Sequence, residues 1–214
     1  MRTSAAAVWQ TVHFERRRLA ADLTGLPDRC WQMPSLCPGW SVHDVLAHLV
    51  DTARTSRLTF ARDLLAARMD FNRANENGIA RHKRQDPQDT IAALQAAADL
   101  TRTPPARLAT RLVEAIVHGE DIRRPLGIAG RYPEAAVAQA LAYQLRTPVS
   151  FGGGRERAAG LRLIDRRTGT AWGLGDDVEA DALDLLLAVS GRPEDPDSLK
   201  GPGGSRLGGR LSYP

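Results

Sequence analysis

The residues best placed to carry out chemistry are two histidines and a glutamate that could share a metal ion. Glu114 and His118 stand four positions apart in the segment EAIVHGED. On an α-helix this spacing puts two side chains one above the other, so a carboxylate oxygen and an imidazole nitrogen can reach the same ion. A third ligand has to come from a neighbouring helix, and His48, inside the apolar stretch LAHLV, is the candidate.

A site of two histidines and one carboxylate leaves at least one coordination position open. An open position for water or substrate is typical of catalytic zinc, although the same ligands also suit Fe(II), Ni(II) or Mn(II). Asp44, which precedes His48 by one helical turn, and Asp121, three residues after His118, could each orient an imidazole. The alternative is that both are solvated acids near helix ends. The helical phase puts the three ligands at the borders of apolar stripes, which fits a cleft wall and plain exposure equally.

No other reactive side chain has a partner at a useful spacing. Cys30 and Cys37 are not spaced as a zinc knuckle or a redox pair, so we expect two reduced thiols. The neighbours of Cys37 carry no charge that would lower its pKa, so we expect no nucleophile from the protein itself. The remaining histidines, His13, His43 and His82, are interpreted as surface or packing residues.

The composition argues against nucleic-acid and membrane partners. The chain has 214 residues and a net charge of +4, with basic side chains scattered among acidic ones. Only 5% of the residues are aromatic, and no basic patch is interleaved with them as a base-stacking surface requires. No run of about 18 apolar residues could span a membrane, and the N-terminal stretch predicts an amphipathic helix rather than a secretion signal. We therefore expect a cytoplasmic protein.

The hydrophobic pattern predicts a mainly α protein whose first part is an antiparallel helical bundle. Residues 25–40 predict an ordered loop, since two tryptophans are costly to expose, and the polar stretch 68–86 predicts a second connection. The predicted helices span residues 4–24, 41–67, 87–100, 107–121 and 133–146.

The composition changes after the last of these helices. Residues 147–160 are a glycine-rich connector, residues 161–175 predict a β-hairpin, and residues 178–190 predict one more helix. We expect two domains, a bundle over residues 1–147 and a small α/β domain over residues 148–214. The second is too short to be stable without docking on the first.

Three segments in fixed order carry a family resemblance. They are CPGWSVHDVLAHLV at 37–50, VEAIVHGEDIRRPLG at 113–127 and FGGGRERAAGLRLIDRRTGTAWGLGDDVEADALDLLLAVSGRP at 151–193. Together they resemble the actinobacterial maleylpyruvate isomerase family of mycothiol-dependent enzymes, within the DinB-like metalloprotein superfamily. The resemblance covers nearly the whole chain.

The resemblance implies a DinB-like four-helix bundle followed by a small sterol-carrier-like α/β domain. It implies a divalent metal, usually zinc, held by the residues that match His48, Glu114 and His118. In the family the metal activates the thiol of mycothiol, and an arginine of the C-terminal domain assists. Arg206 and Arg210 are the candidates for that arginine here.

Two further arginines lie at the end of the second motif. Arg123 and Arg124 could pair with carboxylates of mycothiol or of the substrate, or they could simply cap the C-terminus of their helix.

These features predict an isomerase or thiol S-transferase. Most of a free thiol, with a pKa of about 8.5, is protonated at neutral pH, and a dication favours the thiolate that adds to a small electrophilic substrate. The alternative is a non-catalytic DinB-like protein that binds a metal or a small molecule. A nucleic-acid binder is disfavoured by the motifs, and a monomer is the default expectation.

Overall fold

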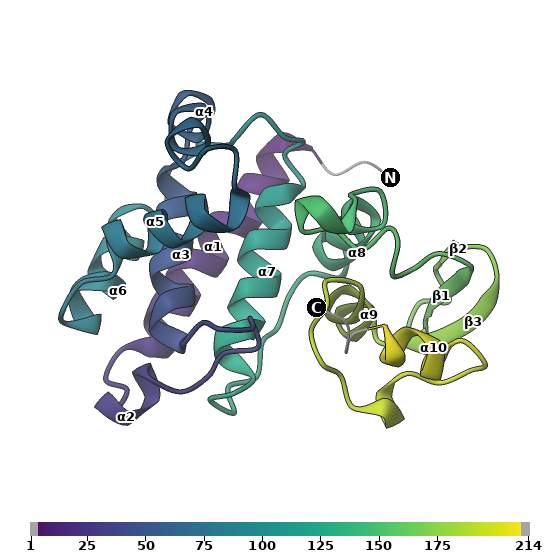
Figure 1. Cartoon of the computed structure of the whole chain (residues 1–214). Coiled ribbons are helices and arrows are strands. Elements are labelled where there is room, and N and C mark those ends of the chain that lie inside the picture. The colour runs from purple at the N-terminus through teal and green to yellow at the C-terminus, as the bar shows by residue number, and fades with distance from the viewer. Residues whose placement is uncertain (1–3, 211–214) are drawn as a thin grey trace. The chain divides into compact units, whose positions relative to one another are not determined.

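The structure, a computed structural model, describes residues 4–210 and divides into two compact units (Figure 1). The first unit ends at Arg131 and the second begins at Tyr132. The sequence placed this boundary at 147/148. It lies earlier because the helix expected over 133–146 packs within the second unit, against a helix near residue 185. Each unit is described here by itself.

The first unit is a four-helix bundle with short helices added to it (Figure 1). Helices α1 and α3 each contact both α6 and α7, which closes a ring of four, and α5 packs on the outside of α3. The predicted mainly α architecture is confirmed. The helices are α1 (Ala5–Leu23), α2 (Asp28–Trp31), α3 (Val42–Arg54), α4 (Arg57–Ala66), α5 (Phe71–His82), α6 (Pro87–Ala96) and α7 (Thr110–Arg123).

The loop before α3 is packed, as its tryptophans predict. Trp31 is buried in the core of the bundle and Trp40 is half-buried against it. Helix α3 then starts from Ser41, whose hydroxyl accepts a hydrogen bond from the backbone N–H of Asp44, while the Asp44 carboxylate accepts one from the backbone N–H of Ser41. This reciprocal cap fixes where α3 begins, and with it which residues face the core.

The cap also explains why Asp44 does not orient His48. Its carboxylate is occupied by Ser41 and by Lys83, whose ammonium donates to Oδ1 at 2.8 Å. Burial by itself raises the pKa of Asp44, but these hydrogen bonds outweigh burial and hold it below its usual value. The expected orienting role is therefore replaced by a structural one.

One predicted helix and one predicted connection differ from the structure. The single helix expected over 41–67 breaks at Thr55, because Ser56 and Thr59 form a second capping box that starts α4. The polar stretch expected to be a connection forms α5, which begins at the cap Asp70. Its few apolar residues suffice for a helix that packs on α3 and α4 at the edge of the bundle.

Arg123 is not available to bind a ligand, because its guanidinium forms ion pairs that join α7 to α1. Its guanidinium is fully buried and contacts Glu15 at 3.3 Å and Asp22 at 2.8 Å, both on α1. The expected role in thiol or substrate binding is therefore not available to this side chain. A guanidinium serves this position because it can satisfy two carboxylates at once.

The second unit holds a three-stranded sheet covered by helices. Helix α9 contacts both α8 and β1, and α10 contacts β3 and α9. The elements are α8 (Glu134–Gln144), the 3₁₀ turn η1 (Val149–Phe151), β1 (Leu161–Asp165), β2 (Ala171–Gly173), β3 (Asp176–Ala180), α9 (Ala182–Val189), the 3₁₀ turn η2 (Pro196–Ser198) and α10 (Gly204–Gly209).

The sheet has the order β2-β1-β3, with β2 antiparallel and β3 parallel to β1. The predicted hairpin is confirmed, but residues 176–180 form a third strand instead of the start of a helix. Alternation decides this, since Val178 and Ala180 are buried while Glu179 between them is exposed. The turn into β3 needs Gly175 (φ +132°), where a Cβ would lie 2.1 Å from the carbonyl oxygen of Gly160.

The glycine-rich connector is packed tightly within the second unit. A Cβ at Gly153 would lie 2.0 Å from the carbonyl oxygen of Thr147, and one at Gly154 would lie 2.4 Å from that of Val189. The glycines therefore permit close backbone approach rather than flexibility.

The sequence predicts that no helix spans a membrane and that the two cysteines form no disulfide bond. Within residues 4–210, no helix has both the length and the apolarity needed to cross a membrane. Cys30 and Cys37 are not disulfide-bonded, as expected from their spacing.

Replacing Arg123 by alanine is expected to lower the free energy of unfolding by about 3–5 kcal/mol, because the buried carboxylate of Glu15 loses its counter-charge. Urea unfolding followed by circular dichroism measures this. Arg17→Ala is the control, since Arg17 is on α1 like Glu15 but forms an exposed ion pair with Asp99, so its loss should cost less than about 1 kcal/mol. Equal effects of the two variants would contradict the locking role.

The stability of the bundle is expected to fall below neutral pH, in part through His43. This ring is buried, and its Nε2 lies 2.9 Å from the hydroxyl of Thr90. Burial lowers its pKa, and nearby Lys83 lowers it further. The unfolded chain therefore takes up a proton near pH 6.5 that the folded protein resists, so stability is full above that pH and is lost as pH falls.

The variant His43→Gln should show a shallower loss of stability between pH 7 and pH 5, by up to about 1.4 kcal/mol per pH unit. Urea unfolding of both proteins in a chelator gives the two slopes. Other histidines are common to both chains, so only the difference between the slopes counts. Identical slopes would show that His43 does not contribute.

Candidate metal centre

The structure brings His48, Glu114 and His118 together between two packed helices. His48 lies on α3, and the other two lie on α7, which contacts α3 directly. The Oε2 atom of Glu114 is 3.5 Å from Nε2 of His48 and 3.6 Å from Nε2 of His118. One ligand atom from each residue lies within 4.8 Å of the other two. The three residues therefore converge on one point.

The two distances that Glu114 makes fit a divalent cation. Ligand atoms about 2.0–2.1 Å from a tetrahedral ion are separated from one another by about 3.3–3.4 Å, close to the two distances that Glu114 makes. Glu114 Oε2 is also buried without a hydrogen-bond partner. An acceptor left in this state is costly unless a cation or a proton occupies the space beside it.

Asp121 orients His118 from the side away from Glu114. Its Oδ2 lies 2.8 Å from Nδ1 of His118, and its side chain is fully buried. When Nδ1 donates a proton to this carboxylate, Nε2 keeps its lone pair and faces Glu114 and His48. Of the two acids expected to orient an imidazole, Asp121 therefore contacts one and Asp44 does not.

The two histidines differ in how they are held. His48 is buried, with 5% of its surface exposed, and its Nδ1 has no hydrogen-bond partner. Its position is fixed by packing instead, since its ring lies 4.8 Å from that of His118 and 5.0 Å from that of Trp40. The placement at the border of an apolar stripe thus corresponds to a buried wall of the site and not to plain exposure.

Trp40 is a member of the site that the sequence analysis did not assign. Its ring centre lies 5.0 Å from that of His48 and 6.5 Å from that of His118. In the sequence, Trp40 could have been found from its position immediately before Ser41, the cap of the helix that carries His48. Its large apolar surface excludes water from one side of the imidazole pair.

The pKa of Glu114 depends on its burial and on the basic side chains around it. Burial by itself raises the pKa of this carboxylate, but His48, His118 and Arg111 outweigh burial and hold the pKa well below its usual range. Burial also lowers the pKa of His48, although Glu114 acts in the opposite direction. An ionised carboxylate is the form of glutamate that binds a metal.

Two buried arginines stand behind this carboxylate. Nη2 of Arg111 lies 4.0 Å from Oε1 of Glu114, while its Nη1 donates to the carbonyl of Thr52 on α3. Arg16, on α1, donates to carbonyl oxygens after the end of α6, and burial together with Arg111 lowers its pKa to about 10. The sequence offered one signal for Arg111, which precedes Glu114 by three residues and so shares its helix face.

The remaining predicted site residues bond to partners other than His48, Glu114 and His118. Arg206 donates to the carbonyl of Gly160, and Arg210 donates to those of Arg157 and Ala159. Both are in the second unit, where they brace the chain entering β1. Arg124 pairs with Glu120 one turn earlier on α7.

Comparison with known proteins agrees with the resemblance in the sequence. Residues 12–107 match the family model described as the mycothiol maleylpyruvate isomerase N-terminal domain. This confirms the resemblance, over a segment that includes His48 but ends before Glu114. Among curated proteins, no significant match is found.

Two solved structures share the fold along nearly the whole chain. One is a crystal structure of the mycothiol-dependent maleylpyruvate isomerase, and the other is a histidine-to-alanine mutant of the same enzyme. Each covers 94% of both chains with a TM-score of 0.64 and 17% sequence identity. At this identity the likeness establishes the fold, which is a helical bundle followed by a small sheet-containing unit.

Proposed function

We propose that the bundle binds a divalent metal, zinc in the first place, through His48, Glu114 and His118, and that the protein is a mycothiol-dependent enzyme. It would act as an isomerase or a thiol S-transferase on a small electrophilic substrate. The observation that carries the proposal is the convergence of two imidazole nitrogens on one buried carboxylate oxygen. The family match over residues 12–107 supports mycothiol as the thiol.

A divalent cation at this point would favour the thiolate form of a bound thiol at neutral pH. The residues of the chain would orient the metal ligands and limit the access of water. Asp121 holds His118 in one tautomer, and Arg111 keeps Glu114 ionised and in place. Trp40 covers the imidazole pair, so a thiol would meet little competing water on that side. No side chain has to serve as the nucleophile.

Three finer predictions remain part of this proposal. One of Arg206 and Arg210 would assist at the thiol or the substrate, as the resemblance implies. A cytoplasmic location and a monomeric state are likewise expected. The competing function is a non-catalytic protein that binds a metal or a small molecule with the same residues, and the second experiment below separates the two.

The purified protein is expected to bind about one zinc ion per chain, as measured by plasma mass spectrometry after dialysis. His48→Ala and Glu114→Ala should each remove it, because two remaining ligands hold a metal poorly. Asp121→Asn should retain the ligands but lower the affinity by about 10–100-fold, since His118 loses its charged orienting partner.

His43→Gln is the matched control for these variants, because His43 is buried on α3 but bonds to Thr90 and not to the site. It should leave the zinc content unchanged. Zinc retained in full by both His48→Ala and Glu114→Ala would refute the site.

Mycothiol is expected to raise the thermal unfolding midpoint of the zinc-loaded protein and to have no effect after chelation. A ligand at a hundred times its Kd adds about 2.7 kcal/mol to stability, which is several degrees for a chain of this size. A panel of electrophiles that includes maleylpyruvate and a chlorodinitrobenzene then tests isomerisation and thiol transfer separately.

Cysteine at the same concentration is the control thiol, because it carries the reactive group without the sugar part of mycothiol. Metal-dependent turnover with mycothiol supports the enzyme. Stoichiometric zinc without a mycothiol-dependent thermal shift or turnover would instead favour the non-catalytic binding protein.

A further inference from the structure

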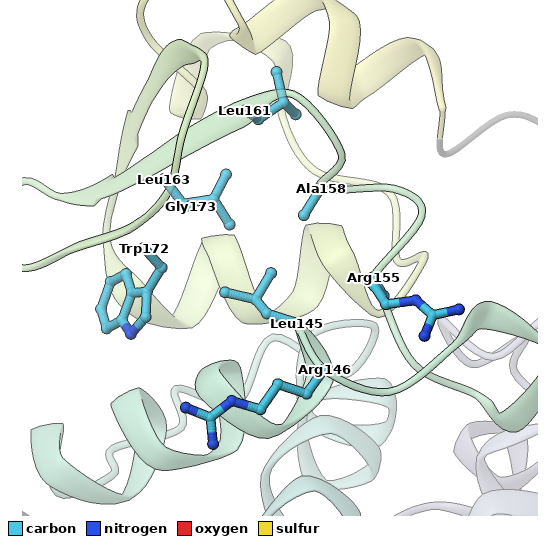
Figure 2. A pocket seen from close by; sticks show the side chains of 8 residues that line it. All are labelled: Leu145, Arg146, Arg155, Ala158, Leu161, Leu163, Trp172 and Gly173. Atoms are coloured by element: carbon cyan, nitrogen blue, oxygen red, sulfur yellow. The ribbon is translucent and has the colours of Figure 1, made fainter.

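The second unit contains a cavity of about 300 Å³ that the proposed metal chemistry does not use (Figure 2). Three segments of this unit form its wall: the end of α8, the glycine-rich segment and the strands β1 and β2. This volume is at the lower end of the range for small-molecule sites. The lining residues are Leu145, Arg146, Arg155, Ala158, Leu161, Leu163, Trp172 and Gly173.

The apolar part of the wall follows from the strand register. Leu161 and Leu163 are two residues apart on β1, so both point to the same side of the sheet, and both are buried. Trp172 on β2 is the direct partner of Leu163 in the antiparallel pairing and is half-buried. A flat molecule in the cavity can therefore contact the aromatic face of Trp172 and the partly exposed Leu145, while the two leucines of β1 form the buried layer beneath them.

Hydrogen bonds next to the lining residues hold the walls of the cavity in place. Gln144, the last residue of α8, donates from its amide to the carbonyl of Gly152 and to the hydroxyl of Ser190. The backbone N–H of Arg155 donates to the carbonyl of Thr147. These contacts fix the glycine-rich segment beside the end of α8, so the wall is already formed without a ligand.

The charge on the cavity is positive. Arg146 is exposed, and its guanidinium has no hydrogen-bond or ion-pair partner among residues 4–210. Arg155 is paired with Glu156, and no acidic residue lines the cavity. In Figure 2 Arg146 runs beneath Leu145 towards the side where Trp172 lies, whereas the guanidinium of Arg155 points away. One unpaired cation thus lies beside a cavity whose wall is partly apolar.

We propose that this cavity binds a small carboxylate with a flat apolar body. The body would lie against Trp172 and Leu145, and the carboxylate would pair with the guanidinium of Arg146 in the two-pronged geometry that carboxylates favour. A single available cation matches a single negative charge better than a phosphate, which requires more donors. The site is separate from the metal centre in its residues and does not rest on the proposed enzyme activity.

Calorimetric titration of the whole chain with naphthylacetate, in a chelator and at low ionic strength, tests the site. The uncharged naphthylacetamide is the matched ligand, because it differs only in the carboxylate. We expect one naphthylacetate per chain, bound about tenfold more tightly than the amide. No binding of naphthylacetate, or equal binding of the amide, would overturn the proposal.

Two variants and a control locate the binding. Arg146→Gln should reduce naphthylacetate affinity about tenfold and leave the amide unaffected, while Ala158→Leu should fill the cavity and weaken both ligands. Arg162→Gln is the control, because Arg162 lies between the two leucines on β1, points to the opposite side of the sheet and approaches Asp177.

Full affinity in Arg146→Gln, or a loss in Arg162→Gln as large as in Arg146→Gln, would refute the site. A loss in His118→Ala equal to that in Arg146→Gln would also refute it, because binding would then depend on the metal centre. Arg146 is exposed, so its substitution should leave the fold intact and remain informative if the leucine variant does not fold.

Discussion

The candidate centre depends on one contact, the packing of α3 against α7. His48 comes from one helix and Glu114 and His118 from the other, so the spacing of their ligand atoms is set by the distance and rotation between the two axes. A helix turns about 100° per residue, and a shift of one residue in either helix would turn a ligand away. Each interaction that fixes α3 or α7 therefore contributes to the chemistry.

Several of those interactions are buried charges. The box between Ser41 and Asp44 fixes the start of α3, and Arg123 ties α7 to α1 through Glu15. Buried ion pairs stabilise a fold little compared with apolar packing, but they tolerate few alternative arrangements, because an unpaired buried charge is costly. We regard this selectivity as the reason why the bundle keeps a charged lock close to a site that needs accurate positioning.

The two units divide the functional features of the chain. The bundle gathers imidazole and carboxylate groups suited to a hard or borderline cation. The second unit offers an apolar cavity with one available guanidinium, and its sheet, turn glycines and packed connector form the walls. The proposed cation site and the proposed anion site therefore belong to different units of the chain.

The sequence by itself determined the helical class, the ligand types and the pairing of Glu114 with His118, because these follow from local periodicity and spacing. Tertiary structure alone decided that His48 meets them, that Trp40 covers them, and that Arg123 is buried, because each depends on which helix faces which. Short-range competition explains why one helix was split, since a second capping box starts α4. β3 formed because its alternating pattern allowed pairing with β1, which overrode a helical pattern. Local sequence patterns do not predict which distant segments come into contact, and these contacts assemble the site.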